Sequence, residues 1–187
     1  DAETGQRGGQ EAEPSAAAPE GSRLAGTEPT PAGAQTPDKH GHSDDDVVDV
    51  LLAQHAQVKD LMARTSAAQG DDKQQLFTEL VTLLKNHEKG EQRVVHPVTR
   101  NRVEDGARVA GLRLGEEERA DQLIAKMANM TVDSGEFQTS FEKLRQSVLA
   151  HAEREEHEEF PKLRRELSTA RLRTMAEELV AVQTAQN

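Results

Sequence analysis

The chain has 187 residues, of which 34% are hydrophobic and 2% aromatic, and it carries a formal net charge of −11 with no cysteine. The absence of cysteine excludes disulfides, iron–sulfur clusters and thiolate ligands, which leaves any metal to histidine and carboxylate side chains. The negative charge argues against nucleic acid as a partner, and the lack of a long apolar run predicts no membrane span or signal peptide and a cytoplasmic protein.

The first 43 residues differ in composition from the rest of the chain. They are rich in Gly, Pro, Ala, Glu and Thr, and Leu24 is their one large apolar residue. Such a segment cannot bury enough apolar surface to offset its chain entropy. We therefore expect a disordered tail over residues 1–43 and a single domain over residues 44–187.

Helical patterning begins at Asp44, for which Ser43 or Asp44 is the expected N-cap. The first helix is predicted over about 46–68, ending before Gly70, and the second over about 72–102, with a bend at Pro97. The third is predicted to end near Met130, and three glycines blur its start. These are Gly106, Gly111 and Gly115.

A fourth helix is expected to follow Ser134 and Gly135 and to run to about Leu167. A short fifth helix, capped by Ser168 or Thr169, has apolar residues at 3-4-3 spacing, and no strand pattern competes. The sequence thus predicts an all-α fold, an up-down-up-down four-helix bundle with a short C-terminal fifth helix. The apolar face of that fifth helix comprises Leu172, Met175, Leu179 and Val182.

Histidine and glutamate interrupt the apolar faces of the predicted helices. In the second helix, His87 and Glu91 continue a 3-4-3-4 series of apolar residues, and in the fourth helix His151 and Glu155 do the same. Residues four apart lie one above the other on a helix, so each pair offers a nitrogen and an oxygen on the inward face. His55 takes a core position in the first helix.

Buried ions are costly unless a counter-charge compensates them. No Lys or Arg appears on the same faces in our reading of the sequence, so bound cations are the economical explanation. A single core histidine is more often satisfied by neighbouring groups than by a metal. The same His-x-x-x-Glu spacing occurring twice weakens that explanation for this chain.

The two segments 87–97 and 151–161 superpose without a gap, which indicates an internal repeat. Sliding segment 54–62 onto 116–124 then places Glu117 opposite His55 and on the apolar face of the third helix. A shift of one residue would select Glu118 instead, and the preceding glycines leave room for it. Successive residues turn about 100° around a helix, so only one of the two can face the core.

This pattern of a lone His, a His-x-x-x-Glu pair, a third-helix ligand and a second His-x-x-x-Glu pair resembles the bacterial branch of the hemerythrin-like HHE cation-binding family. The resemblance covers about Asp46 to Leu167. It implies a site for two metal ions, iron above all with manganese or zinc as alternatives. It also implies that His55 and His87 serve one metal, that Glu91 and Glu155 bridge both, and that the other is served by His151 and Glu117.

The chain departs from the classical oxygen carriers of that family on the third helix. Those proteins have a His-x-x-x-His pair there and an Asp on the fourth helix, whereas this chain has no histidine between His96 and His151. We therefore expect a non-haem di-metal protein that senses or handles oxygen, peroxide, nitric oxide or iron. The alternatives are a peroxidase-like or catalase-like di-iron oxidoreductase and a metal-free helical module that binds a partner.

Three further residues are weaker candidates. His96 precedes Pro97 and lies off the His87–Glu91 face, which favours a place at the surface of the kink or beside a ligand over ligation. Glu88 adjoins His87 and is a minor alternative ligand. His157 lies in a run of glutamates and is expected on a solvated, charged face.

Overall fold

The computed structural model describes residues 45–185, and in this range it contains helices and no strand. The predicted tail over 1–43 and the expected cap at Ser43 or Asp44 lie outside the described residues. The elements in chain order are α1 (Val47–Ala67), α2 (Gly70–Gly90), η1 (Glu91–Val95), α3 (His96–Arg102), α4 (Gly106–Met127), α5 (Gly135–Arg154), η2 (Glu155–Glu159), α6 (Phe160–Glu166) and α7 (Thr169–Thr184).

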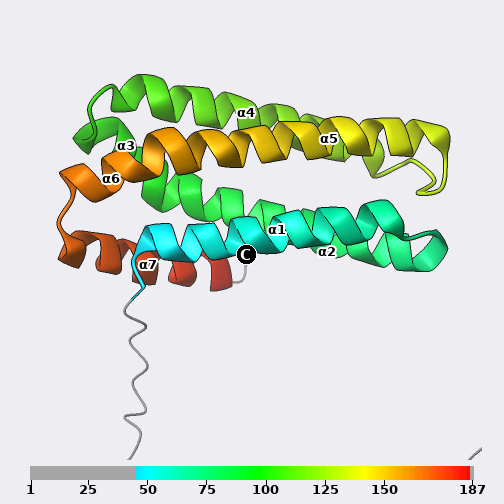
Figure 1. Ribbon diagram of the computed structural model, residues 1–187, viewed down its shortest axis with the longest axis horizontal. Helices are drawn as coiled ribbons and strands as arrows, with labels where there is room; N and C mark the ends of the chain where they lie inside the picture. Colours follow the sequence, from blue (N-terminus) through cyan, green and yellow to red (C-terminus); the bar gives the residue numbers. More distant parts are fainter. Residues whose placement is uncertain (1–44, 186–187) are drawn as a thin grey trace, which may run out of the picture. The chain divides into compact units, whose positions relative to one another are not determined.

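The long helices form two antiparallel pairs, as Figure 1 shows. Helices α1 and α2 make one pair and α4 and α5 the other, while α3 and α6 extend α2 and α5 beyond the two π-helical turns η1 and η2. The short helix α7 packs on α1 and α2. The predicted up-down-up-down bundle with a fifth C-terminal helix is therefore confirmed.

Polar caps define where the helices begin. Asp46 caps α1, because its carboxylate accepts from the backbone N–H groups of Val48 and Asp49, and the Asp49 side chain accepts from the Asp46 N–H in return. Ser168 caps α7, as the sequence predicts, and Ser134 caps α5 in the same way.

Each pair contains one long helix that is interrupted by a π-helical turn just before a proline. The N–H of His96 bonds to the carbonyl of Glu91, and the N–H of Phe160 bonds to the carbonyl of Glu155, so one residue is added to the turn in both places. Prolines 97 and 161 follow immediately and cannot donate a backbone hydrogen bond. The sequence predicts only a bend at Pro97, whereas the structure has a wide turn before each proline.

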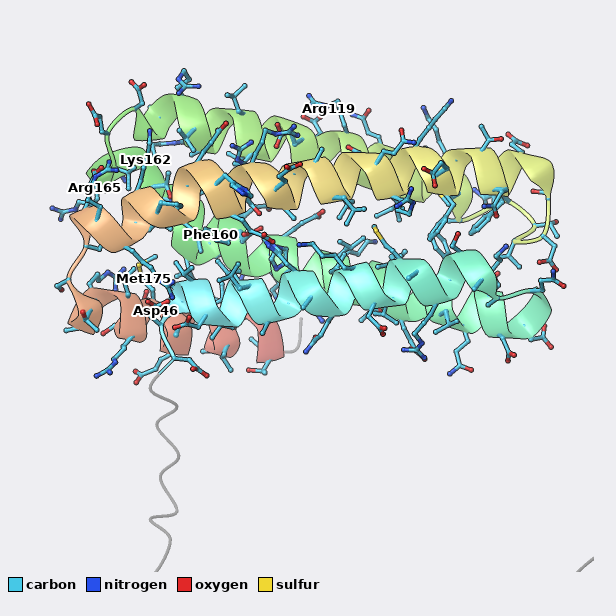
Figure 2. All side chains as sticks on the ribbon, in the orientation of Figure 1. Asp46, Arg119, Phe160, Lys162, Arg165 and Met175 are labelled. Carbon is cyan, nitrogen blue, oxygen red and sulfur yellow. The ribbon has the colours of Figure 1, made fainter. Side chains whose placement is uncertain are left out.

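The apolar core consists of two clusters with a polar layer between them along the helices. The first lies toward the α1–α2 and α4–α5 turns and includes Phe77, Phe137 and Phe141, whose rings pack edge-on or stacked at centroid distances of 5.0–6.2 Å. The second joins the starts of α1, α3 and α6 to α7, and includes Phe160 and Met175, both labelled in Figure 2.

Two glycines allow close approaches that a side chain would block. A Cβ at Gly90 would come within 2.7 Å of Leu179 Cδ1, so this glycine lets α7 lie close to the end of α2. A Cβ at Gly106 would come within 1.9 Å of the Thr99 carbonyl oxygen, which explains why α4 begins there. Gly111 and Gly115 lie within α4 without breaking it.

The phenylalanine trio generates a stability prediction. Phe141 is fully buried, so Phe141→Ala is expected to lower the free energy of unfolding by about 3–5 kcal/mol through lost burial and the cavity it leaves. Leu112 is 49% exposed, and Leu112→Ala should change stability by about 0.5 kcal/mol or less. Denaturant unfolding measures both, and equal effects would contradict the described core.

Candidate metal centre

The six residues singled out in the sequence lie together in the polar layer between the two apolar clusters. Their potential donor atoms form two groups, each with all atoms within 4.8 Å of one another, and both groups contain Glu91 and Glu155. The first group adds His55 and His87. The second adds Glu117 and His151.

The two His-x-x-x-Glu pairs reach the layer from the last turn of a regular helix and the first residue of a π turn. In each pair the Nε2 of the histidine lies 3.1 Å from a carboxylate oxygen of the glutamate, His87 with Glu91 and His151 with Glu155. His55 Nε2 approaches Glu155 from α1 at 3.3 Å. The local helical spacing thus converges three imidazoles on two carboxylates.

The three histidines share one orientation, with Nε2 toward the centre and Nδ1 toward an outer oxygen acceptor. His55 Nδ1 lies 2.9 Å from Glu156 Oε1, and His151 Nδ1 lies 2.9 Å from Glu116 Oε2. A carboxylate acceptor requires the proton on Nδ1, which leaves the lone pair of Nε2 free in the neutral ring. This arrangement is the one that a metal-ligating imidazole needs.

The Nδ1 of the third histidine, His87, faces a pair of hydrogen-bonded glutamines. His87 Nδ1 lies 2.8 Å from Gln54 Oε1, and Gln54 in turn exchanges two side-chain hydrogen bonds with Gln183 of α7, at 2.8 and 3.1 Å. Gln183 thus holds the Gln54 amide in place beside the imidazole. Helix α7 therefore supports the site as well as the core.

The central carboxylates have buried oxygens without hydrogen-bond partners. Glu91 and Glu155 are both 0% exposed, and none of their four carboxylate oxygens is hydrogen-bonded. The Nε2 atoms of His55 and His151 are likewise buried without a hydrogen bond. Buried carboxylates without partners are costly, and a bound cation is what such atoms would ligate. The residues present therefore fit a metal site.

Charges within the layer shift the pKa values of its members strongly. Burial alone opposes the charged forms, but the facing imidazoles lower the pKa of Glu155, and Glu155 and Glu116 raise the pKa of His151 to about 11. Burial also opposes protonation of His87, yet Glu91 raises its pKa. A cation held by these atoms would compete with protons for them, so its binding would release protons.

Glu117 and its neighbours on α4 face three different directions. Glu117 is 3% exposed and faces the centre, while Glu118 is exposed and accepts a 3.4 Å hydrogen bond from Gln122 Nε2. Glu116 is partly buried and holds His151 from outside. The predicted helical face thus has Glu117 on its inward side.

His96 lies in the interior, so the alternative of a place at the surface of the kink is wrong. It is 2% exposed, and its Nε2 lies 2.5 Å from Glu117 Oε1. Burial opposes its charged form, but hydrogen bonding with Glu117 and the nearby Glu159 and Glu91 raise the pKa of His96 to about 10. His157 is exposed, as expected, and bonds to the Glu153 carbonyl.

Sequence reasoning missed two fully buried charges, Arg113 and Glu159. The expectation that no basic residue shares these faces is wrong, because Arg113 precedes Glu117 by one turn and is 0% exposed. It contacts Glu116 at 2.9 Å, Glu158 at 2.8 Å and Glu159 at 3.8 Å. The signal was available: both residues extend an identified face by four positions, Arg113 before Glu117 and Glu159 after Glu155.

A small cavity adjoins the metal-binding atoms. Its volume is about 20 Å³, which is room for about one water molecule, and it lies against His55, His87 and His151. Glu88 also lines it but belongs to neither donor group; burial, together with Asp121 and Glu117, raises the pKa of Glu88 to about 8. The apolar part of the wall comprises Val58, Leu84, Ala120, Val148, Leu149 and Ala152.

The four long helical segments of this antiparallel bundle all direct His or Glu side chains into one buried layer. This arrangement is typical of helical bundle proteins that hold a metal site in their core. The chain belongs to the hemerythrin HHE cation-binding domain family, whose model matches residues 46–163. The predicted family is thus confirmed, and with it a domain that binds metal cations.

A solved structure supports the fold. The chain is similar to a hemerythrin HHE cation binding domain-containing protein from Mycobacterium kansasii, with a TM-score of 0.67, 18% sequence identity, and coverage of 74% of this chain and 85% of that one. A sequence comparison with curated proteins finds no match. Within residues 45–185, no helix is both long and apolar enough to cross a membrane.

The buried arginine generates a second stability prediction. Arg113→Met would leave Glu159 buried with less counter-charge, so we expect a loss of about 3–5 kcal/mol in the free energy of unfolding, measured with a chelator present. Arg145→Met removes an exposed pair with Glu142 and should leave the free energy of unfolding nearly unchanged. Equal costs would show that the Arg113 pairs do not compensate Glu159.

Proposed function

We propose that the chain is a non-haem di-iron protein that binds a small oxygen- or nitrogen-containing molecule at its metal pair. The observation that carries this proposal is the overlap of two donor groups in Glu91 and Glu155, whose four oxygens are buried without hydrogen bonds. Two carboxylates shared in this way suit two neighbouring cations better than one. His55 and His87 would complete one position, and His151 and Glu117 the other.

The donor set argues for iron. Imidazole nitrogen and carboxylate oxygen suit iron and manganese, and zinc is a possible occupant of the same ligands. Bound iron would supply the affinity for oxygen-type ligands and the redox chemistry, while the chain orients the imidazoles, excludes bulk water and holds protons at Glu88 and at the outer histidine nitrogens.

The cavity beside the site limits what can bind there. With room for about one water molecule and a mostly apolar wall, it suits dioxygen, peroxide or nitric oxide, and it is too small for an organic substrate. Ligand size therefore supports sensing or handling of a small molecule.

The second metal position favours one alternative, a di-iron oxidoreductase acting on peroxide. It would have a single imidazole and three carboxylates, a composition that tends toward oxidation chemistry in ferritin-like proteins rather than reversible oxygen carriage. A metal-free module that binds a partner is the least supported reading, because it leaves the buried oxygens of Glu91 and Glu155 without a hydrogen bond. No nucleic-acid partner is proposed.

Metal content is the first test. Reconstitution with ferrous iron under anaerobic conditions should yield two ions per chain by elemental analysis. Glu117→Ala should lose one ion because it removes an inward ligand, whereas Glu118→Ala, a matched change on the exposed side of α4, should retain both. Fewer than one ion in the unmodified chain would refute the proposal, and loss of an ion only in Glu118→Ala would reverse the helix assignment.

The response to small ligands is the second test. The iron-loaded protein should develop new visible absorption on addition of hydrogen peroxide or of dioxygen to the ferrous form, and His87→Ala should lose most of this change. Sustained consumption of peroxide that depends on His87 would favour the enzyme, while a single stoichiometric change would favour a sensor or binding protein. An unchanged spectrum would contradict both.

A further inference from the structure

The two halves of the bundle repeat the same backbone but surround their metal-binding atoms differently. Segment 87–99 in the first half aligns with 151–163 in the second, and their π turns, Glu91–Val95 and Glu155–Glu159, coincide. Segment 51–62 of α1 aligns with 113–124 of α4. Each residue near the site therefore has a matched position in the other half.

Four of the matched positions around His55 are apolar. Its ring stacks on Phe160, with centroids 5.6 Å apart and an interplanar angle of 19°, and Phe160 lies between α6 and α1 in Figure 2. The remaining three positions belong to the same buried apolar cluster as Phe160. They are Leu51, Val95 and Leu163.

Around Glu117, the counterpart of His55, the same four positions are polar. His96 takes the place of Phe160, and the three other positions also exchange an apolar side chain for a polar one. We call His96, Thr99, Arg113 and Glu159 the polar set; they correspond to Phe160, Leu163, Leu51 and Val95 in that order. All four are at most 2% exposed.

The polar set meets Glu117 through His96. His96 Nε2 contacts Glu117 Oε1 at 2.5 Å, and Gln92 Nε2 donates to Glu117 Oε2 at 2.7 Å, so each carboxylate oxygen has one outer donor. Behind His96, Thr99 donates to Glu159 Oε1 at 2.5 Å, and that oxygen lies 3.7 Å from His96 Nδ1.

We propose that His96 is a positioning residue that lets a carboxylate take the place of an imidazole at the second metal position. Each carboxylate oxygen has two lone pairs, and an outer donor on each fixes the carboxylate plane while leaving a lone pair directed inward. The inference rests on the proposed function, because it takes Glu117 as a ligand. Packing alone does not require His96, since a phenylalanine fills the matched position in the other half.

The test converts the Glu117–His96 pair, one residue at a time, into the His–Phe pair found at His55 and Phe160. His96→Phe alone should weaken binding of the second ferrous ion by about 10- to 100-fold, the usual effect of losing an outer partner of a metal ligand. His96→Gln retains an N–H donor and should restore most of that affinity. In a Glu117→His background, His96→Phe should instead strengthen binding of the second ferrous ion, because the two changes together recreate the His55–Phe160 pair.

Chelator competition under anaerobic conditions gives the affinity of each ion, and circular dichroism verifies folding of each variant. Phe160→Leu is the matched control, expected to lower the melting temperature while leaving the second-ion affinity unchanged. Unaltered second-ion affinity in His96→Phe, equal weakening of both ions, or no reversal in the Glu117→His background would overturn the inference. Failure of the unmodified chain to hold two ions would instead refute the proposed function.

Discussion

Glu91 and Glu155 are buried at the centre of the bundle with no hydrogen bond to either carboxylate, and the surrounding structure is arranged around that electrostatic cost. Three imidazoles point Nε2 at these oxygens, and apolar clusters on both sides exclude the water that would otherwise solvate them. In such a low-dielectric layer, charge must be balanced by protons on the imidazoles or by cations. In a fold of a cation-binding family, bound cations can balance the charge of these two carboxylates.

The π turns determine where that layer can form. A regular helix places residues four apart on one face, so His87 and Glu91 align, but continuing the same helix into a proline would remove a backbone hydrogen bond and create a clash. The added residue in each turn accommodates Pro97 and Pro161 and leaves His96 and Phe160 directed at the opposite half. The same local irregularity thus accompanies both the two carboxylates shared by the donor groups and their different surroundings.

Helical periodicity was sufficient to predict the bundle and the inward face of α4, because one face of each helix is buried over many turns. The cap of the last helix was predicted at Ser168 or Thr169, and it is Ser168. Periodicity also brought together the six candidate residues, whose role as ligands stays a prediction. It failed for Arg113, Glu159 and the depth of His96. Arg113 and Glu159 extend the identified faces by four positions, but periodicity alone does not decide whether a charged side chain there is buried. Their burial, and that of His96, depends on pairing across helices, Arg113 with Glu159 and His96 with Glu117.

Helix α7 lies beyond the segment 46–163 that matches the family model, yet Gln183 on it holds the Gln54 amide against His87. Gly90 permits that approach at the last residue of α2. A domain excised at the family boundaries would keep every candidate ligand and still lose the outer brace of one imidazole. The hydrogen-bonded surroundings of the candidate site therefore extend to residue 183, twenty residues beyond the segment that the family model matches.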